Sequence, residues 1–213
     1  MNKMLVIQIS ALIVVSGSLG GMLVFTDVYE EVHSGIVSVL CLSCLKLEPK
    51  TKIDFTFETS YGEPHPDFVL DNLTKGVVFL HYSEDACPGC DIMYPLIQNL
   101  FNITFGKEDM VYKIINFEDL DVAYFYTNID HTSEEMRNSF PIYDKDHISG
   151  LPMFAIITLG YDNGIVRPYY TTVYGTLELD NDQDRIAFLT ELIQESIDIY
   201  NQNWEGYNPS TIN

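Results

Sequence analysis

The feature that most constrains the fold of this chain is the motif Cys87-Pro88-Gly89-Cys90, which closely follows an apolar run at residues 76–82. Such a run is typical of a buried strand, and a C-x-x-C motif that opens a helix brings two thiols within reach of a disulfide. The unpaired N–H groups and the dipole of a helix N-terminus stabilise a thiolate, the nucleophile of thiol–disulfide exchange. The motif therefore predicts a redox-active dithiol at a strand-to-helix junction.

A second motif, Gly150-Leu151-Pro152, lies some sixty residues further on and opens another apolar run at residues 153–159. Periodicity and turn signals predict strands and helices that alternate and end in a hairpin and a last helix, which is the pattern of an α/β domain with a mixed sheet. The predicted strands are residues 53–58, 77–82, 111–116, 153–159 and 168–174, and the predicted helices are 65–73, 87–101, 182–200 and a short one at 133–140 within a mixed segment, 118–146.

Over roughly residues 52–201 this order of elements, with both motifs in place, resembles the thioredoxin superfamily. The resemblance implies a thioredoxin-like fold, in which a central mixed β-sheet is flanked by helices. It also implies that the Leu151–Pro152 peptide bond is cis and that Pro152 packs against the cysteine pair. The backbone of Leu151 would then pair with an extended substrate.

The resemblance also implies roles for the residues of the motif. Cys87 would be the more exposed thiol that attacks a substrate disulfide, and Cys90 would resolve the mixed disulfide. His81 stands where thioredoxins proper carry a buried aspartate, and it either moves the proton of Cys90 or is a core histidine bonded to a neighbour. The other residues assigned to substrate binding are Pro88 and Gly89.

The chain departs from the family pattern beside the motif. Ala86 replaces the usual tryptophan, and Asp91 replaces a basic residue that is common after the second cysteine. Together with Glu84 and Asp85, Asp91 places negative charge near the thiols, which opposes thiolate formation. We therefore expect the dithiol/disulfide couple of Cys87 and Cys90 to be less oxidising than the Cys-Pro-x-Cys motif alone suggests.

The whole chain is strongly acidic, with 31 Asp and Glu residues against 11 Lys and Arg residues and a net charge of −20. This charge argues against nucleic acid or an anionic membrane surface as a partner. The predicted partners are proteins that carry thiols or disulfides. No cofactor beyond the redox-active disulfide, and no metal, is expected.

The N-terminus predicts a membrane anchor at residues 1–26, because residues 4–25 hold no charge and are long enough to span a bilayer. Lys3 precedes this run and acidic residues follow it, which places the N-terminus in the cytoplasm and the domain outside. A cleaved signal peptide is the alternative, with Ser16-Gly17-Ser18 as its cleavage site. In either case the cysteines lie where disulfides persist.

A connector at residues 27–51 carries a second pair, Cys41 and Cys44, and a polar tail at residues 202–213 follows the domain. Three interpretations of this pair stay open. The first is a static pair that is either buried or disulfide-bonded. The second is a redox pair that exchanges with Cys87 and Cys90 or with a membrane redox partner. The third is one half of a four-cysteine zinc site.

The sequence thus favours a membrane-anchored, extracytoplasmic thiol–disulfide oxidoreductase that acts on protein substrates. One alternative is a dedicated reductant for the thiols of a single partner, as cytochrome maturation needs. Another is an interaction module whose disulfide is only structural.

Overall fold

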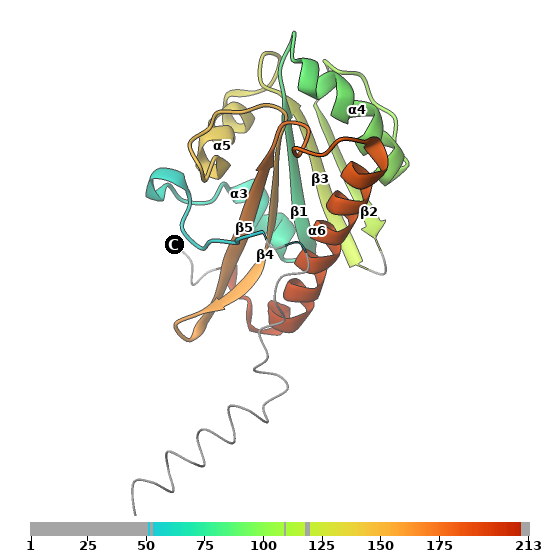
Figure 1. The fold of residues 1–213 in the computed structure, drawn as a ribbon. Coiled ribbons are helices and arrows are strands. Elements are labelled where there is room, and N and C mark those ends of the chain that lie inside the picture. The colour runs from blue at the N-terminus through green and yellow to red at the C-terminus, as the bar shows by residue number, and fades with distance from the viewer. Residues whose placement is uncertain (1–50, 52, 109, 118–119, 210–213) are drawn as a thin grey trace, which may run out of the picture. The chain divides into compact units, whose positions relative to one another are not determined.

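The computed structural model describes residues 51, 53–108, 110–117 and 120–209. They form an α/β unit in which the C-x-x-C motif lies between a central strand and a helix (Figure 1). The elements are 3₁₀ turn η2 (Ser60–Gly62), α3 (Asp67–Leu73), β1 (Gly76–Ser83), α4 (Pro88–Phe101), β2 (Val111–Phe117), β3 (Leu120–Asn128), α5 (Glu134–Tyr143), β4 (Met153–Asp162), β5 (Ile165–Tyr174), α6 (Asp182–Asn203) and 3₁₀ turn η3 (Trp204–Gly206).

Strand β1 is the middle strand of a five-stranded mixed sheet with the order β2-β3-β1-β4-β5. It pairs in parallel with β3, from Gly76 opposite Asp121 to Ser83 opposite Asn128, and antiparallel with β4. The edge strands β2 and β5 pair antiparallel with β3 and β4. Because β1 and β3 run in the same direction, the segments that follow Ser83 and Asn128 begin at the same edge of the sheet.

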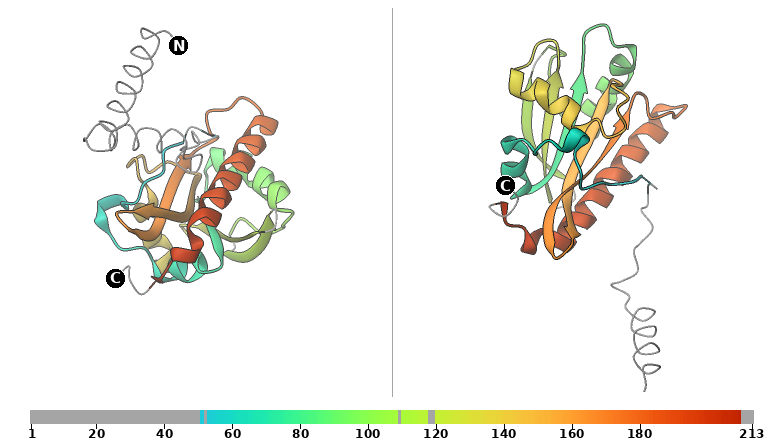
Figure 2. Two further views of the ribbon diagram at one scale, coloured as in Figure 1. Left: turned by 90° about the horizontal axis from the view of Figure 1, so that it is seen from below. Right: turned by 90° about the vertical axis from the view of Figure 1, so that its left-hand side faces the viewer.

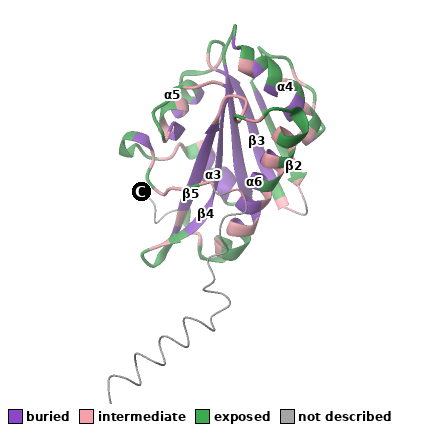
Figure 3. Cartoon of the chain, in the orientation of Figure 1, coloured by how far each residue is buried: buried purple, intermediate pink, exposed green. Residues whose placement is uncertain are grey.

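The pairing of β1 with β3 depends on a glycine. A Cβ atom added to Gly76 would lie 1.9 Å from the carbonyl oxygen of Asp121, so only a residue without a side chain allows this approach. The remainder of β1 is buried along its whole length, as Figure 3 shows. An apolar strand covered on both faces is what the run at residues 77–82 predicts.

Helices cover both faces of the sheet, with α4 and α6 on one face and α3 and α5 on the other (Figures 1 and 2). The ring of Phe79 packs against Phe101 of α4 at 5.3 Å between centroids, whereas the hydroxyl of Tyr82 bonds Ser139 of α5 at 2.7 Å. Because successive side chains of a strand alternate between faces, His81 lies on the same face as Phe79, beneath α4 and α6. This mixed α/β architecture is compatible with the thioredoxin-like fold that the sequence predicts.

Two parts of the sequence-based assignment differ from the structure. The segment assigned as mixed, residues 118–146, begins with β3, a buried strand beside the central one. Residues 53–58 do not form a strand, and Thr56 alone makes an isolated bridge, with Tyr170 of β5. The predicted short helix at residues 133–140 is present as α5, Glu134–Tyr143.

The C-terminal end of the unit extends further than the sequence suggests. Helix α6 continues to Asn203, and Tyr207 forms an isolated parallel bridge with Val166 of β5. The first residues of the predicted polar tail therefore belong to the folded unit.

The predicted membrane anchor and the pair Cys41 and Cys44 lie outside the described residues. In the part of the chain that the structure describes, none of the helices has the length and apolar character needed to span a bilayer.

Candidate active site

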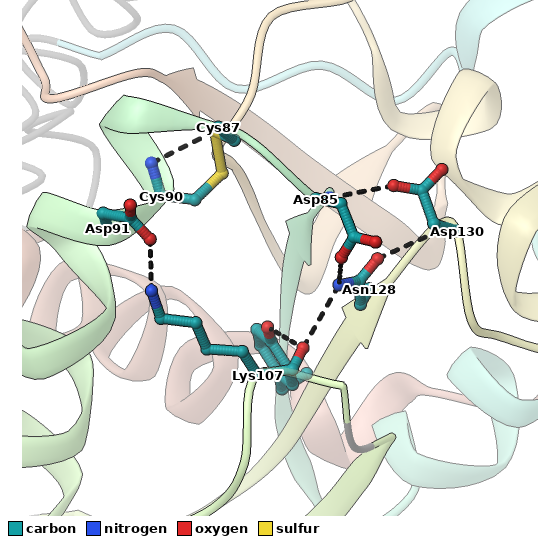
Figure 4. Close-up of a disulfide and its surroundings, with 8 residues drawn as sticks. Asp85, Cys87, Cys90, Asp91, Lys107, Asn128 and Asp130 are labelled. Atoms are coloured by element: carbon teal, nitrogen blue, oxygen red, sulfur yellow. Dashed lines mark hydrogen bonds and ion pairs between the residues drawn. A yellow bond between two sulfur atoms is a disulfide. The ribbon is translucent and has the colours of Figure 1, made fainter.

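The motif forms a disulfide at the start of α4. Cys87 and Cys90 are joined, with their Cα atoms 5.2 Å apart (Figure 4). Cys87 is the N-cap residue of α4, and Pro88 occupies the first helical position, where its missing N–H costs no hydrogen bond. The strand-to-helix junction predicted from the sequence is therefore where the two sulfur atoms lie.

The local geometry suits a thiolate on Cys87. The backbone N–H of Cys90 donates to the Sγ of Cys87 at 3.1 Å, and this sulfur lies at the positive end of the helix dipole. The expected difference in exposure is not seen in the disulfide form, because Cys87 is 6% exposed and Cys90 is 5% exposed. Accessibility therefore does not distinguish an attacking thiol from a resolving thiol here.

The loop that precedes β4 lies directly against the motif. The Leu151–Pro152 peptide bond is cis, as predicted. A Cβ atom added to Gly89 would lie 3.0 Å from the Cδ of Pro152 and 3.4 Å from the carbonyl oxygen of Leu151. The two motifs, about sixty residues apart in the sequence, are thus in contact in the fold, also as predicted.

The backbone of Leu151 has unused hydrogen-bonding capacity. Neither its N–H nor its C=O has a hydrogen-bond partner among the described residues, whereas β4 begins to pair with β5 at Met153. A half-buried backbone with a free donor and acceptor can bind an extended peptide by adding a strand. The role of Leu151 in pairing with an extended substrate stays a prediction.

His81 is deeply buried, with 1% of its surface exposed. Its Nδ1 lies 3.0 Å from the hydroxyl of Tyr124, and its Nε2 has no hydrogen-bond partner. Burial lowers the pKa of His81 to about 3, so the imidazole is neutral over the whole neutral pH range. These features favour the interpretation of His81 as a core histidine bonded to a neighbour.

The acidic residues beside the motif have partners that the sequence does not reveal. The carboxylate of Asp85 accepts hydrogen bonds from Asn128 Nδ2 at 3.0 Å and from His131 Nε2 at 2.9 Å, which lower its pKa. Asp91 forms an ion pair with Lys107 (Figure 4). Asp85 and Asp91, two of the three acidic residues beside the motif, therefore have partners that stabilise their negative charge.

The segments after β1 and β3 are joined at this edge of the sheet. The N–H of Asp85 donates to the carboxylate of Asp130 at 2.8 Å, and Asn128 Nδ2 also donates to the carbonyl of Lys107 at 3.2 Å (Figure 4). Sequence reasoning missed Asn128 and Lys107. The one signal available for Asn128 was its place at the carboxyl end of β3, which is parallel to β1. This signal could not be used, because β3 was not identified from the sequence.

A pocket of about 320 Å³ opens beside Cys90. Its lining includes four acidic residues and one cation, namely Glu84, Asp85, Asp91, Glu108 and Lys107. Cys90 is thus part of the lining of a polar pocket. Chemically, the arrangement offers a dithiol, a helix N-terminus and a free backbone edge within one small region.

The described residues hold no cluster of three or more His, Cys, Asp or Glu side chains that could bind a metal ion. The four-cysteine zinc site is not tested by this finding, because Cys41 and Cys44 lie outside the described part of the chain.

No protein-family model matches the sequence, and a comparison with curated proteins finds no significant match. The function of this protein must therefore be inferred from the geometry of the site.

Proposed function

We propose that this protein is a thioredoxin-like thiol–disulfide oxidoreductase that acts on other proteins through Cys87 and Cys90. The observation that carries the proposal is the contact between the motif and the loop before β4, where Gly89 meets Pro152 beside the free backbone of Leu151. This contact supports the proposal, because it brings a backbone segment with an unpaired donor and acceptor next to a disulfide at a helix N-terminus. A disulfide used only as a staple needs no such edge.

The reduced site would act in two steps. In the first, the thiolate of Cys87 attacks one sulfur of a substrate disulfide, so that a mixed disulfide forms and the other substrate sulfur leaves as a thiolate. In the second, the thiolate of Cys90 attacks the sulfur of Cys87, which forms the intramolecular disulfide and releases the second substrate thiolate. Two electrons pass from the dithiol to the substrate, and the two thiol protons pass to the solvent or to the released thiolates.

The reverse sequence oxidises a substrate dithiol and leaves Cys87 and Cys90 reduced. The direction in use is set by the reduction potentials of the partners. No cofactor beyond the disulfide enters either direction.

His81 takes a limited role in this proposal. With a pKa of about 3, its imidazole is a poor acceptor for a thiol proton, since a free thiol has a pKa of about 8.5. We therefore assign it to packing and to the hydrogen bond with Tyr124. The proton of Cys90 would instead pass to the solvent through the pocket that Cys90 lines.

The proposal keeps the N-terminal anchor and an extracytoplasmic location, where a disulfide of this kind persists. It also includes exchange between Cys87/Cys90 and the second pair, Cys41 and Cys44. If the anchor holds that pair close to the domain, its effective concentration is high. Thiol trapping in cells tests this exchange, because a Cys41/Cys44 double serine variant should shift the redox state of Cys87/Cys90.

One observation favours a different function, an interaction module with a structural disulfide. Both cysteines are almost completely covered in the disulfide form, and structural disulfides are commonly buried. The two functions differ in whether the reduced thiols react readily with external disulfides.

Full-length protein carrying Cys41→Ser and Cys44→Ser has Cys87 and Cys90 as its only thiols, so its reaction with a model disulfide tests the proposal directly. Cys87→Ser should abolish catalysed exchange, and Cys90→Ser should trap a mixed disulfide with the substrate. If Cys87→Ser stays active while Cys90→Ser is inactive, the two roles are reversed. If neither substitution matters, the structural module is the correct function.

A further inference from the structure

A buried carboxylate holds the loop that leads to Pro152. Asp144 follows α5 and is 5% exposed. Its Oδ1 accepts hydrogen bonds from the N–H of Ile148 at 3.1 Å and from the hydroxyl of Tyr174 at 2.7 Å, and its Oδ2 accepts one from the N–H of Ser149 at 2.9 Å. All three partners are donors, so this position is specific for a group that only accepts.

The loop at residues 144–149 needs these hydrogen bonds because two of its residues have an unfavourable backbone conformation. His147 and Ser149 have φ values of 53° and 52°, in the left-handed region that residues other than glycine seldom adopt. Two such residues in one short loop persist only when surrounding contacts impose the conformation. The carboxylate of Asp144 supplies two of these contacts directly to the backbone.

Tyr174 links the same carboxylate to the start of β4. It lies opposite Met153 in the sheet, and its hydroxyl also accepts a hydrogen bond from the N–H of Asp146 at 3.3 Å. The next residue, Gly175, donates its N–H to the carbonyl of Pro152 at 2.8 Å. Contacts from one cluster therefore fix the chain on both sides of Leu151.

We propose that Asp144, together with Tyr174, is a positioning residue that holds the backbone of Leu151 in place for an extended substrate. The proposal rests on the proposed function and deepens it, because it assigns the position of the substrate edge to a cluster whose side-chain hydrogen bonds among the described residues involve neither Cys87 nor Cys90. Its consequence is selective. Loss of the carboxylate should weaken exchange with extended peptides and leave the intrinsic reactivity of Cys87 unchanged.

Two reagents with the same leaving group separate these effects. One is 5,5′-dithiobis(2-nitrobenzoate), which is small and makes no use of a peptide edge. The other is an extended peptide whose single cysteine is joined to the same nitrothiobenzoate. In both cases the thiolate of Cys87 forms a new disulfide and releases the same coloured thiolate, so a difference between the two rates reports binding of the peptide.

The variants are Asp144→Asn and Tyr174→Phe, with Asp146→Asn as the matched control, all in the full-length chain with Cys41→Ser and Cys44→Ser. Asp146 is an acidic residue of the same loop whose side chain pairs with Lys145 at the surface. We expect Asp144→Asn to lower the rate constant for the peptide roughly tenfold and that for the small disulfide less than about twofold. Tyr174→Phe should give a smaller loss of the same kind, and Asp146→Asn no loss.

Hydrogen exchange of the amides of Ile148 and Ser149 provides a readout that is independent of activity, and both amides should exchange faster in Asp144→Asn. Equal losses for both reagents, an unchanged peptide rate or unchanged amide exchange would each overturn the positioning role while the proposed function stands. The parent chain carries Cys41→Ser and Cys44→Ser but neither Asp144→Asn nor Tyr174→Phe. If this parent chain reacts with neither reagent, the proposed function is overturned, and the positioning role with it.

Discussion

Reduction of the disulfide between Cys87 and Cys90 should lower the stability of the folded protein. Two effects oppose each other in this change. The disulfide restricts the unfolded chain, which favours the oxidised form. In the reduced form, the N-terminus of α4 and the N–H of Cys90 stabilise a thiolate on Cys87, which favours the reduced form.

The structure allows both effects to be sized. The loop closed by the disulfide has a sequence separation of three, and the chain-entropy relation for a loop of about four residues gives about 2 kcal/mol at 25 °C. A charge at a helix N-terminus is worth about 0.3–1 kcal/mol. The carboxylates of Glu84, Asp85 and Asp91 reduce that gain, although Lys107 offsets part of the charge of Asp91. We therefore expect the oxidised form to be more stable by about 1–2 kcal/mol.

Thermal unfolding of the oxidised and reduced full-length chain, with Cys41→Ser and Cys44→Ser, measures this difference. Reduction should lower the Tm by roughly 2–8 °C for a protein of this size. By the thermodynamic cycle, the native couple should have a potential about 20–40 mV below that of the same dithiol in the unfolded chain. A reduced form that is as stable as the oxidised form, or more stable, would refute the reasoning, since the helix N-terminus would then outweigh both loop closure and the acidic neighbours.

Three further predictions concern single side chains. Gly89→Ala should slow exchange with both the peptide and the small disulfide, because the new Cβ would lie 3.0 Å from the Cδ of Pro152 and would displace the cysteine motif as well as the loop before β4; rates with the two disulfide reagents test this. Gly76→Ala should destabilise the fold by about 3 kcal/mol or more in urea unfolding, since its Cβ would overlap the carbonyl of Asp121. His81 has a pKa of about 3 in the folded protein and about 6.5 in the unfolded chain, so the unfolded chain binds the proton first as the pH falls. The free energy of unfolding should therefore decrease as the pH falls from about 6.5 toward 3. His81→Leu should flatten the pH dependence of unfolding in that window.

A disulfide at the start of a helix could be predicted from a strong local signal, whereas the cis peptide bond and its contact with the cysteines could be predicted only from the resemblance of the two motifs to the thioredoxin superfamily. Cysteines at fixed spacing after an apolar run define the start of a helix, and a proline at the head of a second apolar run defines a bend. The partners of His81 had no such signal. Its bond to Tyr124 joins residues that are 43 positions apart in the sequence and meet only through the pairing of β1 and β3.

Strand β3 was missed for a related reason. Its bounds were not recognised within the mixed segment 118–146, where acidic residues precede the apolar run and two of its three aromatic residues, Tyr124 and Tyr126, carry hydroxyl groups. In the fold those hydroxyls have hydrogen-bond partners, since Tyr124 contacts His81 and Tyr126 donates to the carbonyl of Lys107 at 2.7 Å. Buried polar groups are tolerated when they are bonded, and the bonding partners are visible only in three dimensions.

The opposite error occurred at residues 53–58, where alternation predicted a strand. Thr56 exchanges both backbone hydrogen bonds with Tyr170, as a strand residue would. The next bonded pair toward the N-terminus of β5 would involve Pro168, which has no N–H to donate. On the other side, the carbonyl of Asp54 accepts from the hydroxyl of Thr171 at 2.9 Å. The ladder is therefore limited to a single bridge, despite the right periodicity.

The candidate site is divided between two parts of the fold that meet at Gly89. The disulfide lies at the junction of β1 and α4, whereas the backbone that we propose as the peptide-binding edge lies in the loop between α5 and β4, where Ser149 donates its N–H to Asp144. Substitution of Asp144 should therefore change only substrate binding, and substitution of Cys87 should remove the chemistry. Gly89 lies between the two cysteines, and a Cβ atom added to it would lie 3.0 Å from the Cδ of Pro152, so its substitution should disturb both parts together. A site built for exchange with polypeptides must show this pattern of separate and joint effects, whereas a structural disulfide has no reason to do so.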